Sequence, residues 1–149
     1  LASLTVDPSR VGTLIESAHA ILAGLDPSDE MAYALYQKKL WSVHLNDQNG
    51  LKFDEDKSFG VVDLRRAFNQ VWVLERNGYG QNGEFVGLDV KALRTQSKET
   101  STKHLRNSRA IFLRLVELVR LLDVAKVEQL RAERDYEELD MLIVKHLIG

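Results

Sequence analysis

The 149-residue sequence contains no cysteine, only two prolines and no apolar run long enough to span a membrane. The lack of cysteine excludes disulfide bonds and thiolate metal sites and is typical of a reducing compartment, so we expect a cytoplasmic protein. Neither sign of charge dominates, because the chain has 20 basic and 22 acidic residues and its formal net charge is −2. This balance provides no overall attraction to nucleic acid or anionic lipid, and we expect neither as a partner.

Hydrophobic residues make up 44% of the chain, which is enough to bury a core. Short apolar stretches alternate with amphipathic ones over roughly the first 90 residues. We predict strands at 11–16, 40–45 and 84–89, and helices from Asp26-Pro27 onward and over 63–77. Alternation of this kind indicates parallel βαβ units.

The remainder of the chain is predicted to be helical. Apolar residues recur at helical spacing over 102–122 and over 135–147. The polar stretch 123–134 is expected to be a connection or a frayed helix. The sequence therefore predicts an α/β unit followed by a helical C-terminal segment.

Potential metal ligands stand at the ends of all three predicted strands: Glu16, His44 and Asp89. Active sites of parallel α/β proteins lie at the C-terminal ends of the strands, where the βα loops gather. We therefore expect these three side chains to meet. His19 follows Glu16 by three residues and can reach the same place as the strand turns into a loop.

An acidic pair, Asp54 and Asp56, lies in the loop after the second predicted strand. In an extended segment both carboxylates point to the same side, and they repel each other unless a cation lies between them. The complete set offers carboxylate oxygen and imidazole nitrogen without sulfur. This combination suits Mg²⁺ or Mn²⁺, allows Co²⁺, and makes zinc a weaker candidate.

Each residue alone has a simpler interpretation. The acidic loop at 54–56 could be a solvated surface loop, Asp89 a helix cap and His44 a core histidine. His104 and His146 lie on predicted helices away from the acidic strand ends, and we interpret them as surface residues. The metal interpretation rests on the coincidence of ligands at three strand ends.

At these positions the sequence resembles the xylose isomerase family. Glu16-Ser17-Ala18-His19 is similar to the family's Glu-x-x-His ligand pair, and residues 46–56 resemble the segment that ends in its Asp-x-Asp ligands. Gly87-Leu88-Asp89-Val90-Lys91 resembles the last ligand-bearing strand, and residues 139–149 resemble the family's C-terminal tail. The likeness covers nearly the whole chain.

The resemblance implies the C-terminal portion of a (β/α)8 TIM barrel, with about three parallel strands and their helices, followed by a helical tail. It also implies two divalent cations and the interconversion of an aldose and a ketose by a metal-assisted 1,2-hydride shift. In this assignment Glu16 bridges the two cations, and His44 and Asp89 hold the first. The second is held by His19, Asp54 and Asp56. The residues assigned to catalysis are Asp54, Asp56, His19 and Lys91.

The sequence departs from the family pattern in two respects. His44 stands where the xylose enzymes carry aspartate, and a histidine there is more similar to the L-rhamnose isomerase group, so the sugar stays open. A complete barrel takes roughly 250 residues. The chain lacks an initiator Met, the family's earlier metal-binding glutamate, its catalytic lysine and its ring-opening histidine.

We therefore expect a fragment that is inactive alone. Residues 1–98 would supply barrel strands, helices and metal ligands, and residues 99–149 would contact another subunit. The expected partners are a sugar substrate and either the remainder of the barrel or another copy of the chain, in a dimer or tetramer.

Two other functions stay open at this point. One is a different divalent-metal enzyme on the same barrel, such as an epimerase or a DNA-repair endonuclease. The endonuclease needs a basic groove for phosphates, and the net charge of −2 counts against it. The other is a non-catalytic half-barrel that serves assembly.

Overall fold

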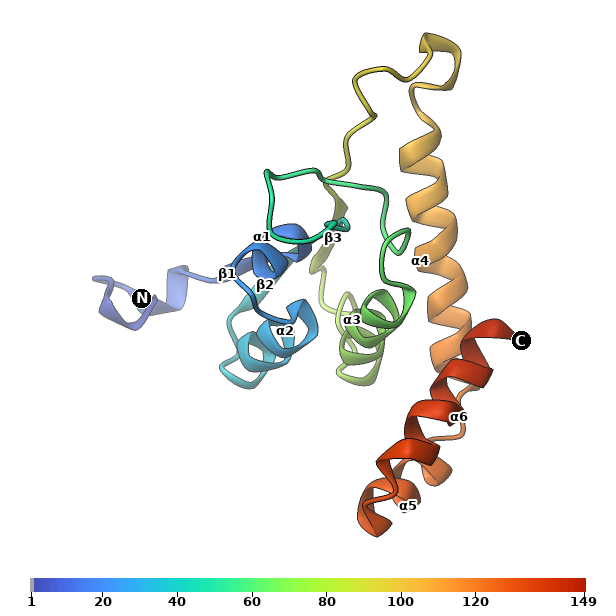
Figure 1. Ribbon diagram of the computed structural model, residues 1–149. Helices are drawn as coiled ribbons and strands as arrows, with labels where there is room; N and C mark the ends of the chain where they lie inside the picture. Colours follow the sequence, from blue (N-terminus) through green and yellow to red (C-terminus); the bar gives the residue numbers. More distant parts are fainter. Residues whose placement is uncertain (1) are drawn as a thin grey trace.

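Three parallel strands form a single sheet in the computed structural model, which describes residues 2–149 (Figure 1). The strands lie in the order β1-β2-β3 and are β1 (Thr13–Glu16), β2 (Leu40–Leu45) and β3 (Phe85–Leu88). The connecting helices are α1 (Ser17–Leu22) and α2 (Pro27–Tyr36) between β1 and β2, and α3 (Leu64–Arg76) between β2 and β3. The predicted partial α/β fold is therefore confirmed.

Helices α2 and α3 begin at the residues whose side chains can cap them. The Asp26 carboxylate accepts a hydrogen bond from the Ser28 N–H at 2.8 Å, and Pro27 takes the first helical position. The Asp63 carboxylate accepts from the Arg66 N–H at 2.9 Å at the start of α3. Both caps satisfy N–H groups that have no partner inside the helix.

The helical tail consists of α4 (Lys103–Leu121), α5 (Val124–Glu133) and α6 (Tyr136–Ile148). The expectation of a connection or frayed helix at 123–134 is wrong, because α5 is regular and ends where Arg134 adopts a left-handed φ of 60°. Val127 and Leu130, three residues apart, are the buried residues of this polar helix, and their burial holds it in place. No helix in residues 2–149 is long and apolar enough to cross a membrane.

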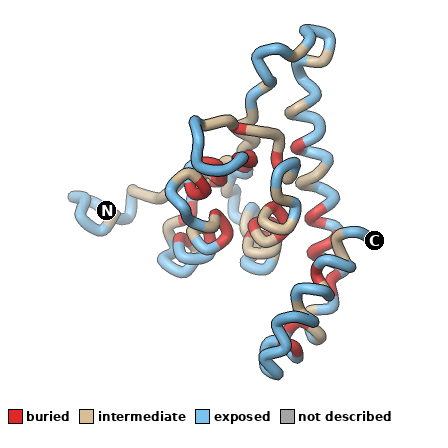
Figure 2. The backbone as a smooth tube through the Cα atoms, viewed as in Figure 1, coloured by how far each residue is buried: buried red, intermediate tan, exposed pale blue. Residues whose placement is uncertain are grey.

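One hydrophobic core joins the sheet to the helical tail. Helix α4 packs against α3, and Figure 2 shows the buried residues gathered on the facing sides of the helices. The core contains side chains from β2, the following loop, α3 and α4, among them Leu45, Phe59, Phe68, Val71 and Leu115. The tail is thus packed onto the helices that support the strand ends.

The interpretation of His146 and His104 as surface residues is wrong, because both are half-buried. Helix α6 folds back so that His146 Nε2 lies 2.7 Å from the carbonyl oxygen of Leu118. The imidazole also packs edge-on against Phe68, with 6.3 Å between ring centroids. Both contacts join segments distant in sequence, so helical periodicity alone could not predict them.

The face of the sheet opposite the helices is open. Leu14 and Phe85 are the register partners of Ser42 on either side of it, so these three side chains share one face. Leu14 is 48% exposed and Phe85 is 76% exposed. The sheet therefore presents apolar side chains on a face that nothing in residues 2–149 covers.

Candidate metal centre

The strand register brings together the ligands at the ends of β1, β2 and β3. Glu16 and His44 are register partners, and Asp89 follows β3 directly. His44 Nδ1 lies 3.3 Å from Asp89 Oδ2 and 3.9 Å from Glu16 Oε2. The three residues each offer a ligand atom within 4.8 Å of the other two, which is a spacing that one cation can span.

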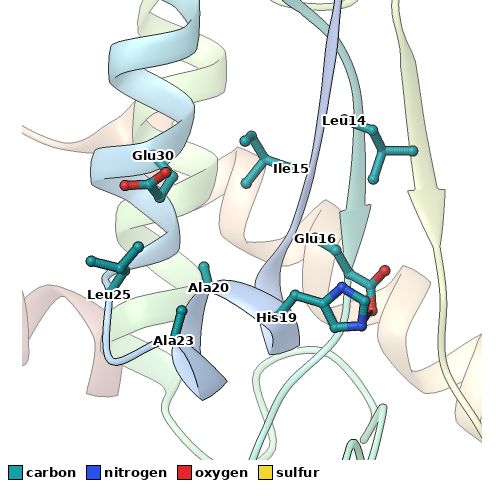
Figure 3. Close-up of a pocket in the computed structure, with 8 residues that line it drawn as sticks. All are labelled: Leu14, Ile15, Glu16, His19, Ala20, Ala23, Leu25 and Glu30. Carbon is teal, nitrogen blue, oxygen red and sulfur yellow. Dashed lines mark ion pairs between the residues drawn. The ribbon is translucent and has the colours of Figure 1, made fainter. Parts of the chain in front are cut away.

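A second group forms around the other oxygen of Glu16. His19 Nε2 lies 3.3 Å from Glu16 Oε1 and 3.6 Å from Asp54 Oδ2. The expectation that β1 turns into a loop is wrong, because α1 begins directly after Glu16 and places His19 within its first turn. Figure 3 shows the Glu16 and His19 side chains lying together beside a hollow of about 280 Å³.

Glu16 is the residue shared by both groups. Its Oε1 faces the His19 side and its Oε2 faces the His44 side, which is the arrangement a carboxylate needs to contact two cations. Burial raises the pKa of this carboxyl, and the hydrogen bond from Asn46 and the nearby His19 oppose the rise. The carboxylates of Asp89 and Asp56 add to the rise. A cation between these groups would offset both the burial and the repulsion.

Asp56 belongs to neither group. The expectation that Asp56 lies in an extended segment is wrong. Its φ is 43°, in the left-handed region, and its side chain is buried. The Lys91 ammonium group contacts Asp56 Oδ2 and lies 3.6 Å from Asp54 Oδ2. The cation between the two aspartates in this structure is therefore Lys91, and its hydrogen bond to Asp56 raises the pKa of the Lys91 ammonium.

The chemistry of the site fits a divalent cation. Asp54 Oδ1 is buried and has no hydrogen-bond partner among the described residues, so a carboxylate oxygen remains free to coordinate. The available atoms are carboxylate oxygens and two imidazoles, without sulfur. This donor set matches Mg²⁺, Mn²⁺ or Co²⁺.

A larger hollow of about 670 Å³ opens next to Asp54 and Lys91. The segment 92–95, which includes Arg94 and Thr95, also lines it. Its lining combines an aromatic ring, Phe53, with charged and hydroxyl groups. This mixture can accommodate a polar molecule that also has C–H surface.

Sequence reasoning missed the polar residues that follow β2. Asn46, Asp47 and Gln48 lie in the loop after the second predicted strand and were not among the expected site residues, yet their exposed fractions are only 1%, 3% and 1%. The Asn46 side chain contacts three of the elements that carry ligands. The available signal was their position directly after a buried strand, at the edge where the ligands gather.

Comparison with curated proteins identifies relatives, although no family model matches the chain. The chain is 35% identical to the xylose isomerase of Thermus thermophilus over 132 residues, which cover 89% of the chain and 31% of that protein. It is 34% identical to the xylose isomerase of Thermus caldophilus over 132 residues, with the same shares of 89% and 31%. The xylose isomerase of Streptomyces lividans is 41% identical over 90 residues, which cover 60% of the chain and 22% of that protein.

The chain spans about a third of the length of the two Thermus relatives. The matching region lies in their C-terminal part, and three parallel strands with a helical tail are consistent with a segment of their barrel. From the sequence similarity and this architecture together, the chain is homologous to the C-terminal part of xylose isomerases.

Proposed function

We propose that the chain supplies the metal-binding part of an aldose–ketose isomerase. The observation that carries this proposal is the position of Glu16, whose two carboxylate oxygens face two separate groups of ligands. A single surface carboxylate would have no reason to be shared in this way. The relationship to xylose isomerases supplies the class of reaction.

In this proposal the chain holds two divalent cations, Mg²⁺, Mn²⁺ or Co²⁺. Glu16, His44 and Asp89 would hold the first, and Glu16, His19 and Asp54 would hold the second. Asp56 would join the second after its ion pair with Lys91 opens, because the Lys91 ammonium and a cation compete for the same carboxylate. When bound, the cations would polarise the sugar carbonyl and lower the pKa of a bound water.

The side chains of the site would bind and orient the sugar for a hydride shift between its first two carbons. His19 lies beside Glu16 and is exposed, so it can contact a ligand that enters from solvent. Before a cation binds, the hydrogen bond with Asp56 raises the pKa of Lys91 and keeps this side chain protonated. We therefore propose that Lys91 neutralises and orients Asp56 until a cation takes its place there.

His44 bears on which sugar is converted. As a ligand its imidazole adds no negative charge, so two carboxylates, Glu16 and Asp89, would surround the first cation. Fewer anionic ligands leave that cation with more positive charge toward sugar hydroxyls. We propose a substrate of either the xylose or the L-rhamnose type, that is, an aldopentose or a 6-deoxyaldohexose.

We further propose that residues 1–149 alone do not turn over sugar. The site is open, since the His19 side chain is 61% exposed, and water would compete for every position around a bound sugar. The uncovered apolar face at Leu14 and Phe85 supports an additional partner. We propose that this partner is the remainder of a barrel or another copy of the chain, in a dimer or tetramer.

A chimera tests the function directly. The C-terminal part of one of the xylose isomerase relatives would be replaced by residues 1–149, and conversion of pentoses and 6-deoxyhexoses would be followed with added Mg²⁺ or Mn²⁺. We expect metal-dependent conversion that Glu16→Gln abolishes and that Asn49→Ala, an exposed change in the same region, leaves intact. A folded, metal-loaded chimera that converts no aldose would contradict the proposal.

A further inference from the structure

Asn46 is a deeply buried polar side chain beside the candidate metal centre. It follows β2 directly and is 1% exposed. Burying a primary amide is costly unless its donors and acceptor are all used. Each of its hydrogen bonds therefore indicates a position that the fold holds in place.

The carbonyl oxygen of Asn46 anchors the start of α1. It accepts a hydrogen bond from the Ala18 N–H at 2.7 Å. Glu16, the residue that precedes α1, makes no capping hydrogen bond with its own side chain. The Glu16 carboxylate thus remains free to face the ligand groups, because Asn46, from the segment after β2, accepts the hydrogen bond of an N–H group at the start of α1.

The amide nitrogen of Asn46 faces the ligand side. Its Nδ2 lies 3.1 Å from Glu16 Oε1, 2.9 Å from Asp56 Oδ1 and 3.0 Å from the main-chain oxygen of Asp89. Two N–H groups are thus shared among three acceptors that come from the ends of β1 and β3 and from the acidic loop. One side chain thus connects three of the segments that carry ligands.

We infer that Asn46 is a positioning residue that fixes Glu16 relative to Asp56 and Asp89 and so sets the separation of the two cation positions. Without its N–H groups, the carboxylates of Glu16 and Asp56 would face each other and repel. The hydrogen bonds hold both in place before a cation arrives, so less ordering accompanies binding. The inference rests on the proposed two-cation function.

The test uses residues 1–149 loaded with Mn²⁺ and followed by electron paramagnetic resonance. Two Mn²⁺ ions bridged by one carboxylate give an exchange-coupled spectrum, whereas separate ions give the six-line spectrum of isolated Mn²⁺. We expect Asn46→Ala to lose the coupled spectrum and to weaken binding at both positions by roughly 10- to 100-fold. Asn49→Ala, exposed and close by, should leave both unchanged.

Asn46→Asp is a second variant, which keeps the test decisive if Asn46→Ala only unfolds the chain. Aspartate keeps an oxygen for the Ala18 N–H but presents a second oxygen, not a donor, to Glu16 and Asp56. We expect this variant to fold and to lose the coupled spectrum. A coupled spectrum in Asn46→Asp like that of the unsubstituted chain overturns the role of Asn46, while a coupled pair missing from the unsubstituted chain overturns the two-cation proposal.

Discussion

Asp47 should anchor the loop that carries Asp54 and Asp56, and its removal should destabilise the fold measurably. It is 3% exposed, and its Oδ2 accepts hydrogen bonds from the N–H groups of Val62 and Asp63 at 2.8 and 3.1 Å. These bonds close the loop onto the start of α3. Asp47→Ala would leave both N–H groups without this partner.

The magnitude follows from the partners that are lost. A hydrogen bond to a charged group contributes roughly 1.5–3 kcal/mol net. Asp47→Ala removes two such bonds, but the cost of burying the Asp47 carboxylate offsets part of what they contribute, so we expect a net loss of about 2 kcal/mol at pH 7. With a urea dependence of about 2 kcal/mol per molar, the unfolding midpoint should fall by about 1 M.

The pH dependence of this effect has a definite sign. Burial raises the pKa of Asp47, and hydrogen bonds from the N–H groups of Val62, Asp63 and Gln48 oppose the rise. The folded chain then binds the proton more tightly than the unfolded chain, so the stability from Asp47 is largest below its unfolded pKa. This stability declines as the pH rises through the folded pKa. Alanine does not titrate, so the loss caused by Asp47→Ala should be larger in mild acid than at neutral pH.

The assay is urea unfolding followed by tryptophan fluorescence at two pH values. Asn49→Ala serves as the control, since its side chain is exposed in the same loop. The control should shift the free energy of unfolding by less than about 0.5 kcal/mol. An Asp47→Ala midpoint equal to that of the control would refute the anchoring role.

Two further substitutions separate the cation positions. A Cβ at Gly87 would lie 2.9 Å from His44 Cδ2, so Gly87→Ala should turn the imidazole away. The affinity for the first cation should then fall by roughly 10- to 100-fold, while the affinity for the second should not change. Calorimetry with Mn²⁺ measures this, and equal losses at both positions would contradict it. Lys91→Met removes the ammonium group that contacts Asp56, so the second cation should bind severalfold more tightly, and an unchanged or weaker second affinity would show that the ammonium does not compete.

Much of the fold could be predicted because its signals are local. The predicted strand at 40–45 is the observed β2, and α2 starts at the predicted Asp26-Pro27 cap. Helix α5 was missed because its buried residues are only two, Val127 and Leu130, and because the helix packs against α6. Tertiary packing decides such a helix, and local propensity does not reveal it.

The candidate site was likewise predictable only in part. Parallel strands end at one edge, so the sequence could predict that Glu16, His44 and Asp89 lie close together. The position of Asp56 depends on its left-handed backbone and on Lys91, which pairs with it across 35 residues of sequence. In the sequence Asn46 resembles an ordinary turn residue. Its role depends on hydrogen bonds to Glu16, Asp56 and Asp89, which lie on three different segments.

Titration of Mn²⁺ into residues 1–149 tests whether Glu16 joins two metal sites. We expect two cations per chain, with Glu16→Gln weakening binding at both positions, His19→Ala mainly at the second and Asp89→Asn mainly at the first. Binding of fewer than two cations, or a Glu16→Gln variant that keeps one position at full affinity, would contradict the claim that Glu16 joins two metal sites.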